Sequence, residues 1–484
     1  MQTYDDGEQE GFYDIFLTAD GGFVACGKIA EEWAAEHQTA DFWVTRIDAQ
    51  GNQIWSNSYP PREVWDDANS IIETDDGNFL IGGHNNVQFA ALLVDDEGEP
   101  IWSNTYVEGI CRAVIELKSG EFLLAGTRVL DSYLLCLDGD GDVIWQRAYE
   151  HGSRSKFYTM RETEGGIIVA GHTVIEREHN VLVKKVDFDG EPIWTRIHGN
   201  DGEGWVCTIM DSRPDGGFIS GGTRTIYEDR DTDIMVMMID DEGRQEGIET
   251  FEWDDVEDAN EACFGLTKLD NGGFALVGLR STRETHPFVI VLNSNGVERW
   301  RRLYSFIDND GNHQPSSFYS VVATEDRSII AAGSIENRRM ITGWDGLLVR
   351  LEQDVPEPVI FYHLPEDTIL SVLPSDTVQF VARARNQLGD EMNYLWLVEG
   401  IEDEDTLGRD TTVTVQFDSL SVYEVQFQVS EGDYMVSITW HITGEEWYID
   451  RHTPDSLSWT IRRPREVDFE LGVRAIEGVE PQFR

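Results

Sequence analysis

Up to about residue 354, the chain consists of short apolar segments separated by glycine-containing turns. Continuous apolar runs such as residues 79–81 and 167–170 are expected of strands that are buried on both faces. Mixed apolar and polar runs such as residues 12–18 precede them, and D-G-G-like turns join the two kinds, because glycine readily adopts the positive φ of a tight turn. The regular glycines and β-branched runs argue against a helical solenoid. The pattern therefore predicts an all-β structure.

The same order of segments returns seven times, with a period of 43 to 56 residues. Each unit continues with a third apolar strand, a D-x-x-G turn and a fourth strand that carries a tryptophan. The glycine that ends the second strand of each unit is Gly27, Gly83, Gly126, Gly171, Gly222, Gly278 or Gly333. The tryptophans are Trp55, Trp102, Trp145, Trp194 and Trp300, and Gly247 takes this place in the fifth unit. Four short strands at this period are typical of a β-propeller blade, with the tryptophans buried between blades.

The two ends of the repeat complement each other. The seventh unit stops after an apolar strand at residues 347–351 and lacks its tryptophan strand, whereas Tyr4 near the start of the chain aligns with Tyr59 and Tyr106. We therefore predict that residues 1–4 form the outer strand of the seventh blade, beside residues 347–351. Such a latch would close the ring and remove exposed strand edges.

The consecutive motifs of the repeat are W-x-x-x-Y, T-x-D-G-G-F, A-G and D-x-W-x-x-R-x-D-x-x-G-x-x-x-W. The repeat resembles the propeller repeats of secreted bacterial surface proteins. Proteins of that group often continue into Ig-like or PKD-like modules. The resemblance covers about residues 1–354 and implies a seven-bladed β-propeller in an extracellular or cell-surface setting. It implies no particular activity. The fifth unit lacks its tryptophan and the seventh lacks its D-G-G turn.

A different pattern begins after a proline-containing linker at residues 355–358. Alternating strands follow at 10- to 20-residue spacing, which predicts an Ig-like, PKD-like sandwich over residues 355–446 with Trp396 as its core aromatic residue. Pro454 to Phe469 repeats the step of 15 residues from Pro365 to Phe380, which indicates the start of a second, truncated Ig-like unit at 447–484. The expected fold is thus a seven-bladed β-propeller, an Ig-like β-sandwich and a partial second Ig-like unit, in a chain cut from a longer secreted protein.

Charge and composition narrow the range of partners. The chain has 37 Lys and Arg against 91 Asp and Glu, a formal net charge of −54, which argues against nucleic acid or an anionic membrane as partner. It contains no apolar run long enough for a transmembrane helix and no signal peptide at its start. The five cysteines are scattered, and we predict that all are unpaired. A monomer, or part of a larger multidomain chain, is expected.

Catalytic and cofactor motifs are absent from the sequence, so we predict no catalytic residue and no cofactor. The acidic segment with Asp308 and Asp310 is predicted to be a turn, with a calcium site as the alternative. His84 and His172 each follow a strand-ending glycine and are either turn residues or neighbours of the central channel.

The connections between second and third strands, and those between successive units, vary in length and share one face of a propeller. Tryptophans outside the repeat pattern lie in or beside them, and we predict a ligand-binding surface there: Trp33, Trp65, Trp205, Trp253 and Trp344. The sequence therefore favours a non-enzymatic binding or scaffold protein for a glycan or a surface protein. The alternative is a secreted polysaccharide hydrolase or lyase with its site at the channel mouth, which would need carboxylates converging with a His or Arg.

Overall fold

The computed structural model divides the chain into two compact units, Met1–Gln353 and Asp354–Arg484, called unit 1 and unit 2 below. It describes residues 1–5, 9–30, 40–59, 66–228, 231–253, 259–308, 311–337, 343–352, 359–365, 369–372, 377–385, 393–399, 412–416, 422–431, 434–444, 447–451, 459–462 and 474–475. These residues form strands and turns and contain no helix. Accordingly, no described segment is a helix that could cross a membrane.

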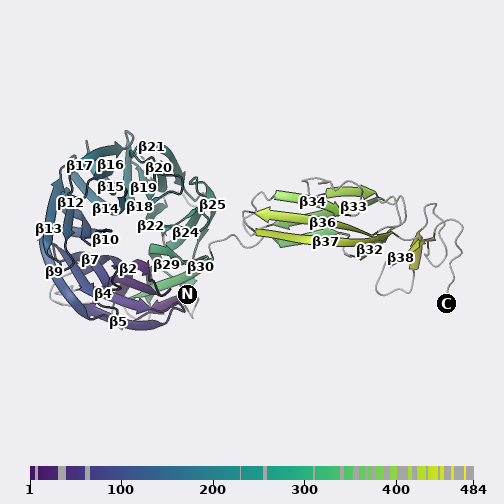
Figure 1. Ribbon diagram of the computed structural model, residues 1–484, viewed down its shortest axis with the longest axis horizontal. Helices are drawn as coiled ribbons and strands as arrows, with labels where there is room; N and C mark the ends of the chain where they lie inside the picture. The colour runs from purple at the N-terminus through teal and green to yellow at the C-terminus, as the bar shows by residue number, and fades with distance from the viewer. Residues whose placement is uncertain are drawn as a thin grey trace. The chain divides into compact units, whose positions relative to one another are not determined.

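Unit 1 is a succession of antiparallel groups of four strands (Figure 1). The first four groups are β2 (Gln9–Leu17), β3 (Phe23–Ala30), β4 (Ala40–Ile47) and β5 (Gln53–Tyr59); β6 (Asp66–Glu73), β7 (Phe79–Asn85), β8 (Gln88–Val94) and β9 (Pro100–Glu108); β10 (Ile110–Glu116), β11 (Phe122–Arg128), β12 (Asp131–Leu137) and β13 (Val143–Tyr149); β14 (Arg154–Thr163), β15 (Gly166–Ile175), β16 (Glu178–Val186) and β17 (Pro192–His198).

The remaining groups continue the same order. They are β18 (Glu203–Ser212), β19 (Phe218–Ile226), β20 (Asp231–Ile239) and β21 (Gln245–Phe251); β22 (Asn260–Lys268), β23 (Phe274–Ser281), β24 (Thr285–Leu292) and β25 (Glu298–Leu303); and β28 (Ser316–Ala323), β29 (Ser328–Asn337), β30 (Gly343–Glu352) and the N-terminal β1 (Gln2–Tyr4). A short hairpin of β26 (Phe306–Ile307) and β27 (His313–Gln314) lies between β25 and β28 in the chain. One parallel bridge, Thr232 to Asn260, links the fifth and sixth groups.

These sheets lie side by side around a ring, which is the arrangement of a β-propeller (Figure 1). The predicted pairing of the N-terminus is confirmed, because Gln2 pairs with Leu348 and Tyr4 with Gly346 on the outer side of β30. One hydrophobic cluster contains Phe12 of β2 together with Ile330 of β29 and Leu348 of β30, so the last group packs against the first.

The strand-ending glycine of each repeat faces a bulge in the innermost strand. In β10, for example, the register shifts between Cys111, which pairs with Gly126, and Ala113, so that Arg112 has no partner in β11. A Cβ on Gly126 would lie only 2.0 Å from the carbonyl oxygen of Ile110. The same close approach, 1.8 to 2.0 Å, occurs at all seven glycines. Only glycine therefore lets the second strand come this close to the bulged strand.

A repeated hydrogen bond joins the outermost strand of one group to a turn of the next. The hydroxyl of Tyr149 in β13 donates to the carbonyl oxygen of Gly190 over 2.7 Å, and Tyr59 and Tyr106 do the same to Gly98 and Gly141 over 2.8 and 2.9 Å. Tyr4 of β1 donates to Gly51 over 2.8 Å. The N-terminal strand thus makes the contact that the outermost strands of the first three groups make.

Loss of one of these hydroxyls should destabilise unit 1 modestly. For Tyr149→Phe we expect the free energy of unfolding to fall by about 1 kcal/mol, since the ring still packs but the bond to Gly190 is lost. Denaturant titration measures this, and Val143→Thr on the exposed part of β13 is the matched control. Equal stability of Tyr149→Phe and Val143→Thr would contradict a stabilising role for the bond.

The repeat tryptophans are less buried than the sequence predicts. Trp300 is buried, but Trp55, Trp102, Trp145 and Trp194 are half-buried, so for these four the prediction is wrong. They stand on outermost strands, and their rings lie over the turn glycine of the next group: a Cβ on Gly141 would lie 3.0 Å from the Trp102 ring. The indole N–H of Trp102 also donates to the carbonyl oxygen of Gly139 over 3.0 Å. These rings therefore stay partly accessible to solvent.

The prediction of unpaired cysteines is confirmed, since all five are buried as free thiols. They lie on four of the four-stranded groups, where their small side chains pack between sheets. Burial raises the pKa of the Cys111, Cys136 and Cys207 thiols to about 12, which keeps them protonated and unreactive near neutral pH. A thiol titration of the denatured chain without reductant should therefore return five; a value of three or fewer would contradict the free-thiol assignment.

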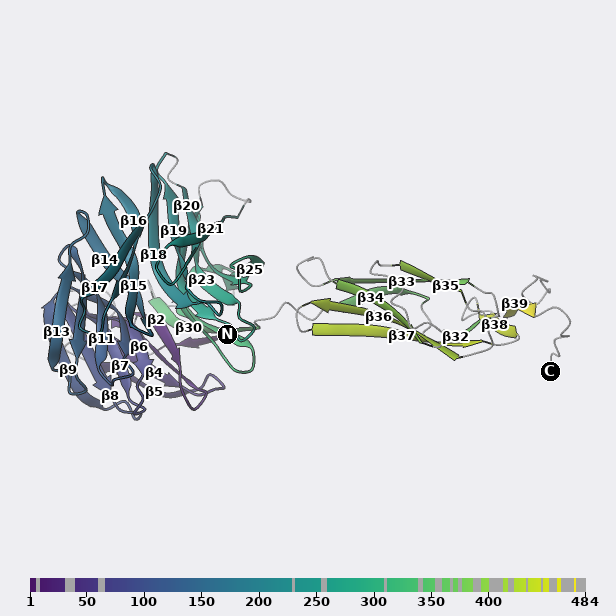
Figure 2. The same cartoon turned by 45° about the horizontal axis from the view of Figure 1, so that its top comes forward.

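Unit 2 contains two facing sheets around one core (Figure 2). One sheet has the order β31 (Val359–Leu364), β33 (Thr377–Arg385), β35 (Thr412–Gln416), and the other has β32 (Ile369–Val372), β37 (Tyr434–Gly444), β36 (Val422–Glu431), β34 (Asn393–Glu399). Trp396 is fully buried, as predicted, and packs with Phe427 and Trp440. A further small sheet has the order β39 (Trp459–Arg462), β38 (Trp447–Arg451), β40 (Arg474–Ala475). The predicted linker at 355–358 lies outside the described residues.

Candidate functional site

A cavity of about 830 Å³ runs along the innermost strands of unit 1. Each of these strands contributes the residue that its bulge leaves unpaired, and all seven line the cavity: Tyr13, Asn69, Arg112, Tyr158, Thr208, Phe264 and Tyr319. The bulge therefore shapes the cavity, because it leaves one residue of each innermost strand to line it.

The unpaired residues give the cavity an aromatic side and a polar side. Tyr319 packs edge-on against Tyr13 at 5.6 Å between ring centroids and lies 5.3 Å from Phe264. On the polar side, the guanidinium of Arg112 donates to Asn69 Oδ1 over 3.2 Å. Burial, and then the negative charge of Asp67, raise the pKa of Tyr13, so its hydroxyl stays protonated at neutral pH. Such a wall offers ring faces and hydrogen-bond donors to a ligand.

Two carboxylates of the cavity wall, Asp14 and Asp211, interact with other groups of the protein. Asp14 accepts from the hydroxyl of Ser320 over 2.7 Å and from the backbone N–H of Ile71 over 3.0 Å, which ties three neighbouring groups of strands together. Burial raises its pKa above the usual range. Asp211 pairs with Arg161 over 3.4 Å. We therefore assign both carboxylates to the scaffold of the cavity rather than to chemistry.

A second, smaller pocket of about 280 Å³ shares Arg112 with the central cavity. Arg154 and Lys156 of β14 complete a group of three cations around it, with Glu108 as the acidic residue in its wall. Burial lowers the pKa of Lys156, and the positive charges of Arg112 and Arg154 lower it further. The three like charges therefore repel one another in the free protein, and an anion bound between them would relieve this repulsion.

The two histidines singled out in the sequence, His84 and His172, lie in the strands β7 and β15 rather than in turns, and neither of them lines the cationic pocket. His172 packs against Tyr158 of the cavity at 5.6 Å and against His179 at 4.8 Å. Burial, then His179 and Lys156, lower the pKa of His172 to about 3, so it is neutral at physiological pH. His84 Nε2 lies 3.8 Å from Asp67 Oδ2, and burial lowers the pKa of His84 as well. Neither imidazole adds positive charge near neutral pH.

Of the five predicted tryptophans, the structure describes three, and none of these three is fully exposed. Trp33 and Trp65 lie outside the described residues. Trp205 is buried in β18, where its indole N–H donates to Glu203 Oε2 over 2.7 Å and its ring belongs to the core between the fourth and fifth groups, so its assignment to a ligand surface is corrected. Trp253 is half-buried between Phe288 and the guanidinium of Arg301, which lies 5.2 Å from the ring centroid. Trp344 is half-buried in β30.

The acidic segment around Asp308 forms a turn in the residues that the structure describes. Asp308 Oδ1 accepts from the backbone N–H of Asn312 over 2.8 Å, and Asp308 Oδ2 accepts from the Asn312 amide over 3.1 Å. The same aspartate contact, to the N–H four residues on, stabilises the turns at Asp48, Asp95, Asp138, Asp187 and Asp240. Asp310 lies outside the described residues.

The sequence analysis did not single out the residues that line the cavity, although a signal for them exists. The unpaired residue stands eight positions before a turn residue with positive φ: Tyr13 before Gly21, Arg112 before Gly120, and Tyr319 before Arg327. Arg327, with φ of 61°, takes the place of glycine where the seventh repeat lacks its D-G-G turn. Once the bulge is placed opposite the strand-ending glycine, the spacing of eight residues identifies the unpaired residue of every repeat.

Comparisons with known proteins leave the function open. No protein-family model and no curated protein matches the chain. Among solved structures, it is similar to the extracellular domain of a protein described as a hybrid two-component system from B. thetaiotaomicron, with 10% identity, a TM-score of 0.40 and coverage of 90% of this chain. The chain spans only 55% of that protein's length.

Two further solved structures match most of the chain. A protein of unknown function from Dyadobacter fermentans matches with 11% identity, a TM-score of 0.45 and coverage of 72% of this chain and 97% of its own. The Dos1 propeller matches with 10% identity, a TM-score of 0.40 and coverage of 70% and 77%. The arrangement of its own sheets makes unit 1 a β-propeller, and these matches assign no function.

Proposed function

We propose that this chain is a non-enzymatic binding protein whose unit 1 takes an acidic glycan at the mouth of its central cavity. The observation that carries the proposal is the group of three cations, Arg112, Arg154 and Lys156, around a pocket that shares Arg112 with the central cavity, which is lined in part by aromatic residues. Carboxylate or sulfate groups of a glycan would bind to the cations, and sugar rings would stack on Tyr158 or Tyr319. A surface protein remains the other class of ligand and is distinguished by the experiment below.

The architecture proposed for this role is a seven-bladed β-propeller in unit 1, followed by an Ig-like sandwich and a second, partial Ig-like unit, in an extracellular or cell-surface protein. Seven consecutive four-strand groups, with β1 completing the last, support the propeller. Two facing sheets around Trp396 support the sandwich. Trp253 and Trp344, with Trp33 and Trp65, would extend the ligand surface beyond the pocket.

Calorimetric titration with polygalacturonate tests the proposal directly. We expect binding by the wild type, no binding of neutral dextran, and weakening by salt, because the contacts are charge-assisted. Arg112→Ala and Lys156→Ala should each weaken binding about tenfold or more, as expected when a charged hydrogen bond worth about 1.5–3 kcal/mol is removed. Lys118→Ala is the matched control, since Lys118 is 83% exposed in the turn between β10 and β11.

Two results would count against an acidic glycan as ligand. Equal binding of polygalacturonate by wild type, Arg112→Ala and Lys156→Ala would show that the pocket is not the site. Binding of polyglutamate but not of polygalacturonate or heparin would indicate an acidic protein segment instead. Neither result depends on the stability of the variants, which thermal unfolding would check separately.

A polysaccharide lyase remains the second candidate, because Tyr13, Asp67 and Arg112 line the same cavity and His84 lies close to Asp67. A lyase needs a base beside the sugar carbon, a cation on the uronate and an acid for the leaving oxygen. The alternative predicts an unsaturated, ultraviolet-absorbing product from polygalacturonate, lost in Tyr13→Phe while binding persists. Binding without any such product would support the non-enzymatic role.

A further inference from the structure

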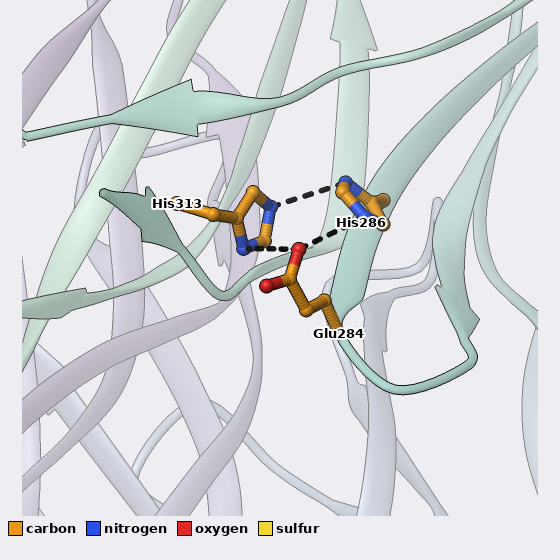
Figure 3. Close-up of side chains that lie close together, drawn as sticks. All are labelled: Glu284, His286 and His313. Atoms are coloured by element: carbon orange, nitrogen blue, oxygen red, sulfur yellow. Dashed lines mark hydrogen bonds and ion pairs between the residues drawn. The ribbon is translucent and has the colours of Figure 1, made fainter. Parts of the chain in front are cut away.

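Two histidines and a glutamate come together away from the cationic pocket, at one end of the sixth group of strands. Glu284 precedes β24, His286 is the second residue of β24, and His313 begins β27 (Figure 3). Glu284 belongs to the bend that leads into β24, two residues before His286. His313 belongs to a different segment, 27 residues further along the chain.

The side chains face one another at short distances. His313 Nε2 and His286 Nδ1 are 3.1 Å apart, and the ring centroids are separated by 4.3 Å. Glu284 Oε2 lies 3.5 Å from His313 Nδ1 and 4.0 Å from His286 Nε2, as the dashed lines in Figure 3 indicate. One ligand atom from each residue can be chosen so that all three lie within 4.8 Å of one another.

This donor set is suited to a transition metal. Zn²⁺ binds imidazole nitrogen and carboxylate oxygen at about 2.0–2.2 Å in a tetrahedron, which places neighbouring ligand atoms roughly 3.3 Å apart. The distances from Glu284 to the two imidazoles exceed this by less than 1 Å, a shift within reach of the rotamers of an exposed glutamate. Ca²⁺ and Mg²⁺ prefer oxygen ligands and are disfavoured by two imidazoles.

The acidic turn that precedes His313 helps to position this histidine. Asp308 and Asn312 close the turn through a backbone bond of 2.9 Å and the side-chain bonds described above. This turn returns the chain from β26 to β27, where Phe306 pairs with Gln314. Asp308, the alternative calcium ligand of the sequence analysis, thus stabilises the hairpin of β26 and β27. The hairpin places His313 next to His286 of β24.

We propose that Glu284, His286 and His313 bind one divalent transition-metal ion such as Zn²⁺, which fastens the connection between β25 and β28 to β24. Three protein ligands leave one position of a tetrahedron for water or for a group of a ligand. The site lies outside the residues of the cationic pocket and does not depend on the glycan-binding function proposed above.

Titration of the EDTA-treated full chain with ZnCl₂, followed by calorimetry, tests the proposal. We expect one saturable equivalent and a rise in the melting temperature of unit 1. His286→Gln and His313→Gln should each weaken the binding by about 100-fold or more, because even partners behind the ligands contribute about 10- to 100-fold. Glu284→Gln preserves the shape of the side chain but removes its negative charge, and it should also weaken the binding.

The matched control is His441→Gln, because the imidazole of His441 lies 3.0 Å from Glu424 but belongs to no group of three potential metal ligands among the described residues. It should bind Zn²⁺ as the wild type does. Co²⁺ substitution should give visible absorption bands that are lost in His286→Gln, which reports coordination independently of stability. Failure of the wild type to bind a saturable equivalent, or unchanged binding and spectra in the two histidine variants, would overturn the proposal.

Discussion

Gly333→Ala is expected to destabilise unit 1 by about 3 kcal/mol or more, the upper range for overpacking. Its Cβ would lie 1.8 Å from the carbonyl oxygen of Ser317 and 2.9 Å from the Cα of Phe318, so the clash is with backbone that has no rotamer to change. To admit the methyl group, β29 must separate from β28 at the bulge. That movement would also displace Tyr319, the unpaired residue of this strand, from the cavity wall.

The control for this variant is another glycine-to-alanine change. Gly139 has no heavy atom within 4 Å of a Cβ built on it, so Gly139→Ala should alter stability by less than about 0.5 kcal/mol. Thermal and denaturant unfolding of the purified chains measure the difference. Insoluble Gly333→Ala beside soluble Gly139→Ala would agree with the expectation, whereas equal melting temperatures would show that the bulge tolerates a wider separation.

The sequence predicts the sheets of unit 1 well because two local rules repeat in phase. Strands buried on both faces require apolar runs, and the bulge requires glycine opposite it, so residues such as Gly126 recur at a regular place. The pairing of β1 with β30 also follows from the sequence, since Tyr4 carries the hydroxyl that bonds to Gly51. A contact that recurs from group to group can be predicted from the sequence, because the same residue type recurs with it.

The candidate site is harder to predict, because tryptophan exposure and cation clustering depend on which strands become neighbours. Trp205 stands beside a variable connection in the sequence, yet the bulged strand turns its ring into the core between sheets. Arg112 and Lys156 are 44 residues apart and belong to different repeats, and only the ring brings them to one pocket. In the same way, His286 and His313 meet through a hairpin that interrupts the repeat.

Trp396→Ala is expected to lower the stability of unit 2 by about 3–5 kcal/mol and to leave the unfolding of unit 1 unchanged. Trp396 is fully buried; its ring lies 4.7 Å from that of Phe427 and 5.7 Å from that of Trp440, so truncation leaves a large cavity between the two sheets. At about 4–8 °C per kcal/mol for a domain of this size, one calorimetric transition should fall by more than about 12 °C.

The matched control for Trp396→Ala lies on the exposed side of β35. Thr414→Ser removes a methyl group from solvent-exposed surface and should move neither transition by more than about 0.5 kcal/mol. The chain divides into two compact units, and we expect each to unfold in a transition of its own. A fall of both transitions in Trp396→Ala would contradict that independence, and an unchanged unit 2 transition would show that the cluster around Trp396 is not the core of its fold.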